Sequence, residues 1–322
     1  MYLLQTGSLI RIHTPAKINL FLEVLERRED GFHEIETLMT AINIYDTLYF
    51  SANNEGQIRL TCRWAQGLKA KQIFDESNQR GSALGDLPKT TDNIVYLAVE
   101  KLRQRCGVLR GASIDLVKRI PAAAGLGGAS SNAAAALIAA NRAWKLGWSH
   151  RQLAELAAEI GSDVPFFFGC GMFGSGAAIC RGRGERIEPI AAMPRWHLVV
   201  VRPPEGFATA EVYRNCQVKG KPVEIGPLLR ALQQRNSAKI PLTMTNRLQS
   251  AAAKLSPWTE RLQNEFNRLD LLAHQMSGSG SSYFGICRHA RHARHVAAQL
   301  RSRGVGSVFC AFTIASSKHL VK

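Results

Sequence analysis

The sequence predicts an α+β fold, in which strand-like and helix-like segments follow one another without strict alternation. Strand-like segments alternate apolar and polar residues, whereas helix-like segments repeat apolar residues every three or four positions. The mixed order argues against a doubly wound parallel sheet, which requires regular strand–helix alternation. With 322 residues, of which 46% are hydrophobic, the chain is long enough to bury the cores of two domains.

The first 91 residues contain two strand-like segments and a long irregular one. Residues 9–24 alternate apolar and polar side chains as a strand does, although Lys17 and Asn19 interrupt the alternation. Residues 34–50 show the same kind of pattern. Residues 62–91 are polar, rich in Gly, Lys and Gln, and without a clear period. We therefore expect them to form a long surface insertion or loop.

A helix and a strand come next. We expect Asp92 to cap a helix over residues 94–105. Residues 112–120 are strand-like, and Pro121 ends this strand because proline lacks the N–H that a sheet requires. The apolar side of the helix consists of Val95, Ala98, Val99 and Leu102.

The remaining segments continue the mixture of strands and helices. A glycine-rich turn precedes an alanine-rich helix over residues 131–144, and Ser149 is expected to cap a second helix over residues 149–160. Further strands are predicted over residues 176–189, 197–202, 283–287 and 306–315. Further helices are predicted over residues 225–234, 245–254, 257–269 and 290–303.

The composition limits the class of protein. The net charge of +16 attracts anions, but it does not separate a nucleic acid from a nucleotide substrate. The densest basic stretch, residues 288–303, is typical of a helix with a solvated arginine face, and no aromatic residues interleave with it. The seven cysteines are odd in number and lack a C-x-x-C spacing, so we expect reduced thiols in a cytoplasmic protein. The apolar runs are too short for a membrane span, so we expect no membrane partner.

The most informative local feature is the glycine-rich segment 121–133, PAAAGLGGASSNA, which follows a strand and opens a helix. Glycines let the backbone turn with positive φ and approach an anion closely. The free N–H groups and the dipole of the helix start then favour a bound phosphate. Ser130 and Ser131 add hydroxyl groups that could also reach a metal ion on the phosphates.

Two familiar phosphate-binding loops do not fit this segment. A Walker A loop ends in Gly-Lys-Ser/Thr, and no such lysine is present. The dinucleotide fingerprint G-x-G-x-x-G requires glycine at position 130, where Ser130 stands. It also favours an acidic residue about twenty positions further on, where this chain has Lys145.

Residues 15–20 (PAKINL), 121–133 and 276–282 (MSGSGSS) are three motifs that follow one another along the chain. In this order they resemble the N-terminal motif, the phosphate-binding motif and the C-terminal glycine motif of the GHMP kinases, a family of ATP-dependent small-molecule kinases. The resemblance implies a two-domain fold, with an N-terminal βαβ-type domain whose helices cover its sheet (residues 1–175) and a C-terminal ferredoxin-like α/β sandwich domain (residues 176–322). The active site would lie in the cleft between them.

The same resemblance implies ATP as the phosphoryl donor, accompanied by Mg²⁺, because nucleoside triphosphates carry this ion to kinases. No cluster of carboxylates announces a metal site, so no protein ligand of the metal is predicted. The implied ATP-binding residues are Lys118, Pro121, Ala122, Ala123, Ala124, Gly125, Leu126, Gly127, Gly128, Ala129, Ser130 and Ser131.

The chain further resembles the branch of that family whose acceptor is a cytidine diphosphate-linked sugar alcohol. The resemblance rests on residues 15–24, 28–38, 161–167, 203–213 and 245–248. It implies that the γ-phosphoryl group of ATP moves to a tertiary hydroxyl, a poor nucleophile that needs a base or an orienting carboxylate.

The resemblance assigns the reacting groups residue by residue. Asp163 would be the carboxylate that faces the hydroxyl. Lys17 would lie beside it, keep it ionised and stabilise charge on the transferring phosphoryl group. Asn19 would form a hydrogen bond to the sugar-alcohol portion of the acceptor.

The cytosine end of the acceptor requires a flat slot with hydrogen bonds to the edge of the base. Phe32 and Tyr213 match the two family positions that enclose the ring, although many relatives have tyrosine where Phe32 stands. His33 would bind the edge of the base, and the resemblance also places Thr209 and Gly278 at the acceptor. Aromatic stacking is worth about 1–3 kcal/mol per base.

Two alternatives remain open at this point. A homoserine or mevalonate kinase-like member of the family would not need a cytosine slot. A basic nucleic-acid-binding protein would show tight, salt-sensitive binding of RNA or DNA. The predicted partners are small molecules, with neither nucleic acid nor membrane among them, and the chain is expected to be a monomer or homodimer.

Overall fold

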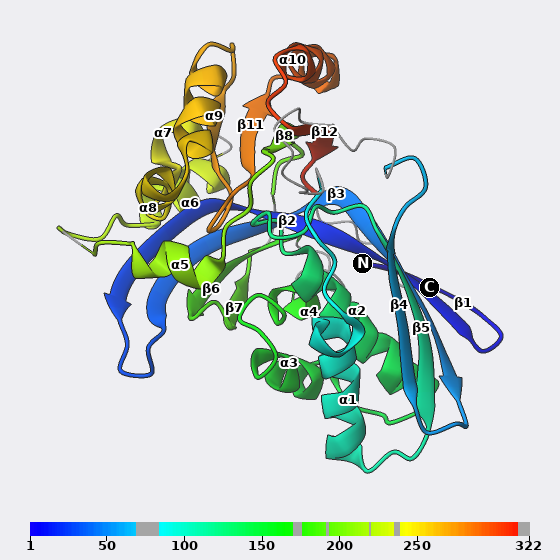
Figure 1. The fold of residues 1–322 in the computed structure, drawn as a ribbon. Helices are drawn as coiled ribbons and strands as arrows, with labels where there is room; N and C mark the ends of the chain where they lie inside the picture. The colour runs from blue at the N-terminus through cyan, green and yellow to red at the C-terminus, as the bar shows by residue number, and fades with distance from the viewer. Residues whose placement is uncertain (69–83, 170–175, 191–192, 219, 235–238, 315–322) are drawn as a thin grey trace.

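The computed structural model describes residues 1–68, 84–169, 176–190, 193–218, 220–234 and 239–314. Their strands form two sheets that lie one above the other, with helices on the outer face of each (Figure 1). The predicted α+β class is therefore confirmed. None of the helices in these ranges is long and apolar enough to cross a membrane.

A long antiparallel ribbon forms the centre of the first sheet. Its strands, β2 (Leu9–Arg27) and β3 (His33–Asn53), extend the predicted segments 9–24 and 34–50 in both directions. Five more strands pair directly with them or with each other, β1 (Tyr2–Thr6), β4 (Ile58–Trp64), β5 (Gly111–Lys118), β6 (Ala177–Gly182) and β7 (Arg186–Pro189), and a two-residue strand β9 (Thr245–Asn246) joins β2.

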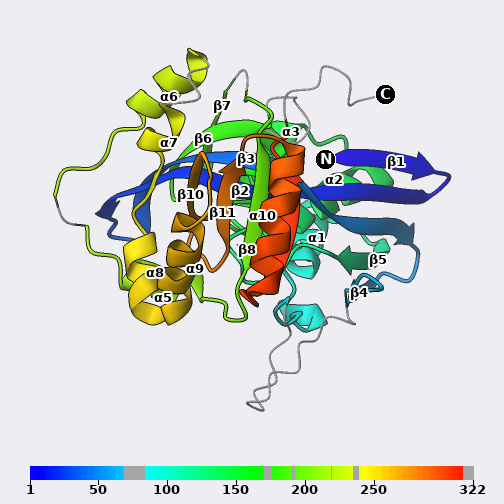
Figure 2. The ribbon, with the colours of Figure 1, turned by 90° about the horizontal axis from the view of Figure 1, so that it is seen from above.

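The second sheet is antiparallel, in the order β10 (Ala273–Met276), β11 (Tyr283–Cys287), β8 (His197–Arg202), β12 (Ser307–Phe312). Alternation in β8 decides its two faces. Leu198 and Val200 pack in the apolar cluster shared with the first sheet. Val199 and Val201 pack in the outer cluster with α10 (Ala290–Ser302), which lies along β8 in Figure 2.

Four helices cover the far face of the first sheet: α1 (Ile94–Cys106), α2 (Gly128–Ala143), α3 (His150–Ala158) and α4 (Phe166–Gly169). The alanine-rich α2 is buried along most of its length and contacts β2 and β3, since small side chains let helix and sheet approach closely. Ser149 caps α3 as predicted, and Gln152 completes a capping box. The second sheet carries α8 (Gln249–Leu255), α9 (Pro257–Asn267) and α10, while α5 (Thr209–Arg214), α6 (Gly226–Gln233) and α7 (Ile240–Thr243) lie in the connections.

Several predicted boundaries are wrong. Asp92 ends a short 3₁₀ helix (Thr90–Asp92), and Asn93 is the residue whose side chain caps α1 by accepting from the Val95 amide. The predicted helix 245–254 begins only at Gln249, because Thr245 and Asn246 pair with β2 and the Asn246 side chain accepts from the Leu248 amide.

Other differences concern single segments. The predicted insertion 62–91 includes the end of β4 at Trp64, and its residues 69–83 lie outside the described ranges. Residues 176–189 form two strands rather than one, because Gly182 and Gly184 adopt positive φ and turn the chain between them. Since β6 pairs with β3, and β7 pairs with β6, both strands belong to the first sheet. The division of domains at residue 175 remains a prediction.

Candidate active site

The glycine-rich segment leads from β5 into α2 and packs against the second glycine turn, residues 277–282. A Cβ atom on Gly125, which has φ +68°, would lie 2.1 Å from the Ser277 carbonyl oxygen, so only glycine fits there. The Ser277 hydroxyl donates to the Gly125 carbonyl (3.0 Å), and the Ser282 amide donates to the Ala124 carbonyl (3.2 Å). The two glycine motifs, about 150 residues apart in sequence, therefore form one surface.

That surface borders a cleft of about 1130 Å³. The cleft lining contains every predicted site residue except Ser131. The hydroxyl of Ser131 is buried and has no hydrogen-bond partner among the described residues, while its amide donates to the Gly127 carbonyl. The cleft also contains Asn93 and Cys62, at the start of α1 and in β4.

The centre of the cleft holds Lys17 and Asp163, which come from β2 and from the turn between α3 and α4. Their Nζ and Oδ2 atoms are 3.3 Å apart. Lys17 is 4% exposed and Asp163 is 31% exposed, so the ammonium lies in the wall and the carboxylate faces the open space. The Lys17 amide also donates to the Leu126 carbonyl (2.9 Å), which fixes the glycine-rich loop to β2.

Asn19 positions the lysine. Its Oδ1 accepts from Lys17 Nζ (2.7 Å), and its Nδ2 donates to the Thr37 hydroxyl (2.8 Å), which in turn donates to the Phe21 carbonyl. Both polar ends of this amide therefore have partners in the protein. The predicted contact of Asn19 with the acceptor remains a prediction.

A buried carboxylate, Asp46 of β3, organises the base of the loop, and sequence reasoning did not find it. Asp46 is 0% exposed and pairs with Lys118 Nζ. Its Oδ1 accepts from the amides of Arg119 (2.5 Å) and Ile120 (2.8 Å), and its Oδ2 accepts from the Asn132 amide group (2.9 Å). One side chain therefore fixes the end of β5, the start of α2 and the lysine that lines the cleft between them.

The acceptor end of the cleft carries the three predicted aromatic residues. Phe32 is 48% exposed at the tip of the β2–β3 hairpin. The rings of His33 and Tyr213 lie 5.2 Å apart at 31°, so His33 contacts the tyrosine that was predicted to enclose the base. Burial, and then the charge of Arg27, lower the pKa of His33. Burial, and then the charge of Asp163, raise the pKa of Tyr213, so both rings are neutral at pH 7.

The second glycine turn is held near the acceptor end by Asn246. The Asn246 amide group donates to the carbonyls of Met276 and Gly278, both at 2.8 Å. The hydroxyls of Thr209 and Ser279 lie 3.0 Å apart and join α5 to this turn. Gly278 has φ +57°, and a Cβ atom there would lie 3.1 Å from Lys17 Nζ, which places the turn directly beside the Lys17 ammonium.

The chain is similar to kinases over both of its halves. Models of the GHMP kinases N terminal domain and of the GHMP kinases C terminal domain match residues 93–172 and 219–306. A 4-diphosphocytidyl-2-C-methyl-D-erythritol kinase of Pelotomaculum thermopropionicum is 40% identical over 288 residues, which are 89% of this chain and 92% of the relative.

Solved structures give the same result. The crystal structure of a 4-(cytidine 5'-diphospho)-2C-methyl-D-erythritol kinase superposes with a TM-score of 0.72 at 30% identity, over 95% of this chain and 99% of that one. A homoserine kinase from Cytophaga hutchinsonii superposes with a TM-score of 0.69 over 98% of both chains, but at 16% identity it shows a shared fold alone.

Proposed function

The chain belongs to the 4-diphosphocytidyl-2-C-methyl-D-erythritol kinase family of GHMP kinases, and we propose that Asp163 and Lys17 are the pair that carries its phosphoryl transfer. The enzyme is an ATP-dependent phosphotransferase with an alcohol acceptor. It phosphorylates the 2-hydroxyl of 4-diphosphocytidyl-2-C-methyl-D-erythritol in the non-mevalonate route to isoprenoid precursors. The fold and the activity predicted from the sequence are thereby confirmed.

The contact between Lys17 and Asp163, beside the glycine-rich loop, is the observation that carries the proposed mechanism. The hydroxyl oxygen of the acceptor bonds to the γ-phosphorus while the bond from that phosphorus to the ADP oxygen breaks. The hydroxyl proton passes to Asp163, whose carboxylate also orients the oxygen. Lys17 stabilises the negative charge on the phosphoryl group as it moves, and Asn19 holds the ammonium in place.

The phosphates of ATP would bind at the start of α2, where the first amides of a helix lack intrahelical partners. Ser130 and Asp163 both line the cleft, and their side-chain oxygens are the kind of ligand that Mg²⁺ prefers. The described residues contain no group of three or more His, Cys, Asp or Glu that could hold a metal, which suits an ion bound mainly by phosphate and water. When bound, the ion would neutralise charge on the phosphates.

The cytosine would bind between Phe32 and Tyr213, with His33 at its edge. The support for this assignment is that all three line the acceptor end of the cleft, and that Phe32 exposes its ring there. A homoserine or mevalonate acceptor has no base to fill this space. We also propose that the enzyme acts on soluble small molecules in the cytoplasm, as a monomer or homodimer and without nucleic acid; the six described cysteines are free thiols, which suits a reducing compartment.

Substitution Asp163→Asn tests the reacting pair. We expect turnover to fall by about 10²–10⁴, the usual effect of removing a general base, while the affinity for ATP changes little. Turnover with saturating Mg·ATP and acceptor, and ATP binding by calorimetry, measure the two quantities. Asp270→Asn, which makes the same chemical change at an exposed site in the turn between α9 and β10, is the control. Normal turnover in Asp163→Asn would remove this carboxylate from the mechanism.

An acceptor panel tests the substrate independently of any variant. ADP release is measured with Mg·ATP and the cytidine compound, mevalonate or homoserine in turn. We expect release with the cytidine compound alone. Release with mevalonate or homoserine, and none with the cytidine compound, would contradict the assignment of the aromatic slot.

A further inference from the structure

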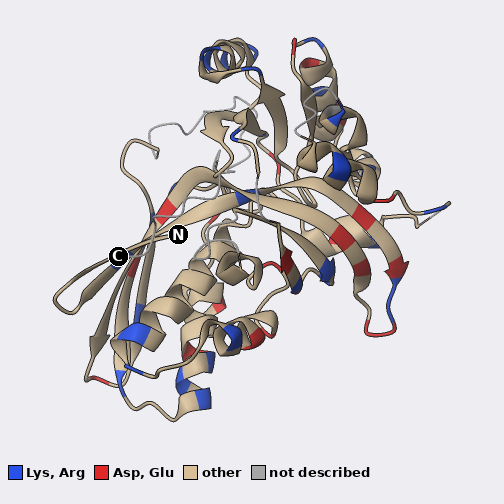
Figure 3. Cartoon of the chain, turned by 180° about the vertical axis from the view of Figure 1, so that it is seen from behind, with Lys and Arg blue, Asp and Glu red and all other residues tan. Residues whose placement is uncertain are grey.

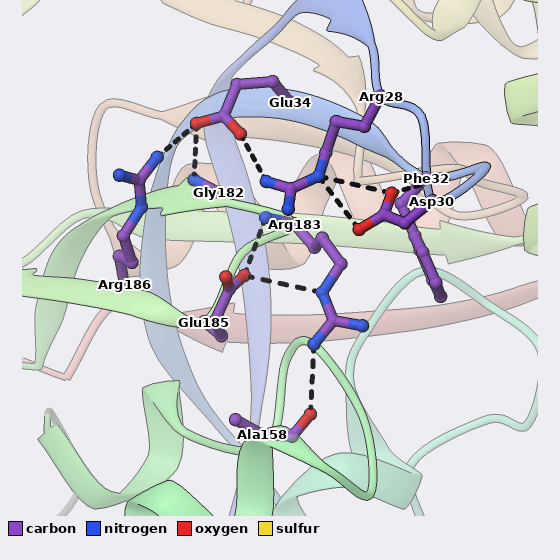
Figure 4. A network of polar contacts seen from close by, with 9 residues as sticks. All are labelled: Arg28, Asp30, Phe32, Glu34, Ala158, Gly182, Arg183, Glu185 and Arg186. Atoms are coloured by element: carbon purple, nitrogen blue, oxygen red, sulfur yellow. Dashed lines mark hydrogen bonds and ion pairs between the residues drawn. The ribbon is translucent and has the colours of Figure 1, made fainter.

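Arg183 lies in the turn between β6 and β7 and reaches into the cleft. Its guanidinium carbon is 4.7 Å from the centre of the Phe32 ring, a cation–π distance, and both side chains line the cleft. Figure 4 shows the side chain extending from this turn between the β2–β3 hairpin and Ala158 of α3. The arginine is 28% exposed, so its charge is only partly screened by water.

The surrounding arginines have carboxylate partners at short distances, whereas the contacts of the Arg183 guanidinium are longer. Arg28 contacts Glu34 at 2.8 Å, Arg181 contacts Glu36 at 2.8 Å, and Arg186 pairs with Glu34. The Arg183 guanidinium is 4.0 Å from Glu185, whose carboxylate accepts a 2.7 Å hydrogen bond from the Arg183 amide, and 3.4 Å from the Ala158 carbonyl (Figure 4). Its planar fork is therefore weakly engaged and can bind an anion.

The turn that carries Arg183 also packs against the catalytic segment. A Cβ atom on Gly184 would lie 3.7 Å from Asp163 Oδ1 and 3.6 Å from the Ser162 carbonyl. Arg183 therefore lies against Phe32, and the next residue in the chain, Gly184, lies close to Asp163. In the acceptor, the diphosphate connects the cytidine to the methylerythritol unit, so it must span the region between the base slot and Asp163.

We propose that the guanidinium of Arg183 binds the diphosphate of the acceptor and makes the enzyme select a nucleoside diphosphate over an uncharged nucleoside. The inference rests on the proposed function, because it takes Phe32 as the base slot and Asp163 as the catalytic end. Arg27 and Arg214 also line the cleft but are exposed to solvent, where their charges are screened more strongly. A planar guanidinium also matches two phosphate oxygens at once, which a lysine cannot.

Calorimetric binding of cytidine 5′-diphosphate and of cytidine tests the proposal. The full-length protein is first saturated with Mg²⁺ and a non-hydrolysable ATP analogue, so that neither probe binds in the ATP position. We expect Arg183→Gln to lose about 10- to 100-fold in affinity for the diphosphate, the worth of a charge-assisted hydrogen bond, and to bind cytidine as before. Arg183→Lys should recover part of the loss, because it restores the charge without the fork.

The control is Arg186→Gln, which removes the same charge three residues further along the chain. The Arg186 side chain is 64% exposed and does not line the cleft. It should retain the wild-type preference for the diphosphate. Equal losses for both probes in Arg183→Gln would mean that Arg183 only supports the Phe32 ring, and unchanged diphosphate affinity would also overturn the proposal. Failure of the wild-type protein to bind either probe would overturn the proposed acceptor itself.

Discussion

At the scale of single residues, the roles in the cleft depend on partners that are distant in sequence. Asp163 and Lys17 stand within recognisable motifs, so their proximity in the cleft could be predicted from the sequence, while their catalytic roles stay a proposal. Asp46 could not, because its four donors come from residues 118–132 and an isolated aspartate in a strand has no signature. Arg183 was missed for the same reason, since its environment arises only when the β6–β7 turn meets the β2–β3 hairpin.

The substitution Asp46→Asn should be strongly destabilising. It leaves the buried Lys118 ammonium without its counter-charge, and breaking a buried pair in this way costs about 3–5 kcal/mol in the free energy of unfolding. Urea unfolding measures this free energy. Asp115→Asn, which removes the partner of Arg63 from a more exposed pair, should cost about 0–1 kcal/mol. Similar losses in the two variants would contradict the structural role given to Asp46.

At the scale of elements, periodicity located most helices and strands, whereas their ends depended on local contacts. The helix 94–105 and the strands 197–202 and 283–287 agree with the structure to within one residue. The two-residue strand β9 was missed because its pairing with β2 crosses more than 200 residues. The apposition of the two glycine motifs has no local signal either, although the motifs themselves were recognisable.

The contact between the glycine motifs predicts a difference between two alanine variants. Gly125→Ala should suffer left-handed backbone strain of about 1–2 kcal/mol and a further penalty of about 1–3 kcal/mol from the collision with the Ser277 carbonyl. Gly147→Ala, at φ +72° with no atom within 4 Å, should suffer the strain alone. Thermal unfolding and ATP binding check both variants. ATP affinity should fall in Gly125→Ala only, and an equal loss in both would refute the close packing of the motifs.

At the scale of the whole molecule, the composition predicted a large hydrophobic core, but not that this core is divided into three apolar clusters. One apolar cluster lies between the first sheet and its helices, a second between the sheets, and a third outside the second sheet. The two-domain arrangement followed from the family resemblance rather than from periodicity, because stacking two sheets is a long-range event. Figure 3 shows basic residues on α10 and on helices of both layers, and acidic residues on other helices and on strands, so charged residues of both signs are spread over the described part of the molecule.

Acidification should destabilise the folded molecule. Burial lowers the pKa of His274, whose ring lies 3.1 Å from the Tyr283 hydroxyl. Below the ordinary histidine pKa the unfolded chain therefore binds a proton that the folded protein does not, and stability falls as the pH is lowered. Urea unfolding at about pH 7.5 and at about pH 5.5 measures the change.

His274→Asn keeps a polar group near the Tyr283 hydroxyl and should reduce the pH dependence. His295→Asn, an exposed position on α10, should leave it unchanged. If His274→Asn loses as much stability on acidification as the wild-type protein, another group is responsible for the effect.

The β2–β3 ribbon has a consequence for the size of acceptor that the enzyme accepts. Lys17 stands in the middle of β2 and Phe32 at the tip of the hairpin, and register irregularities after Asn19 and Val24 bend the ribbon between them. Under the proposed assignment, Lys17 of the reacting pair and Phe32 of the base slot therefore lie on one continuous, strongly paired element with a constant number of residues. With the base stacked on Phe32, we expect an analogue with a single phosphate to leave its alcohol short of Asp163, so that the enzyme would select against shorter nucleotide conjugates.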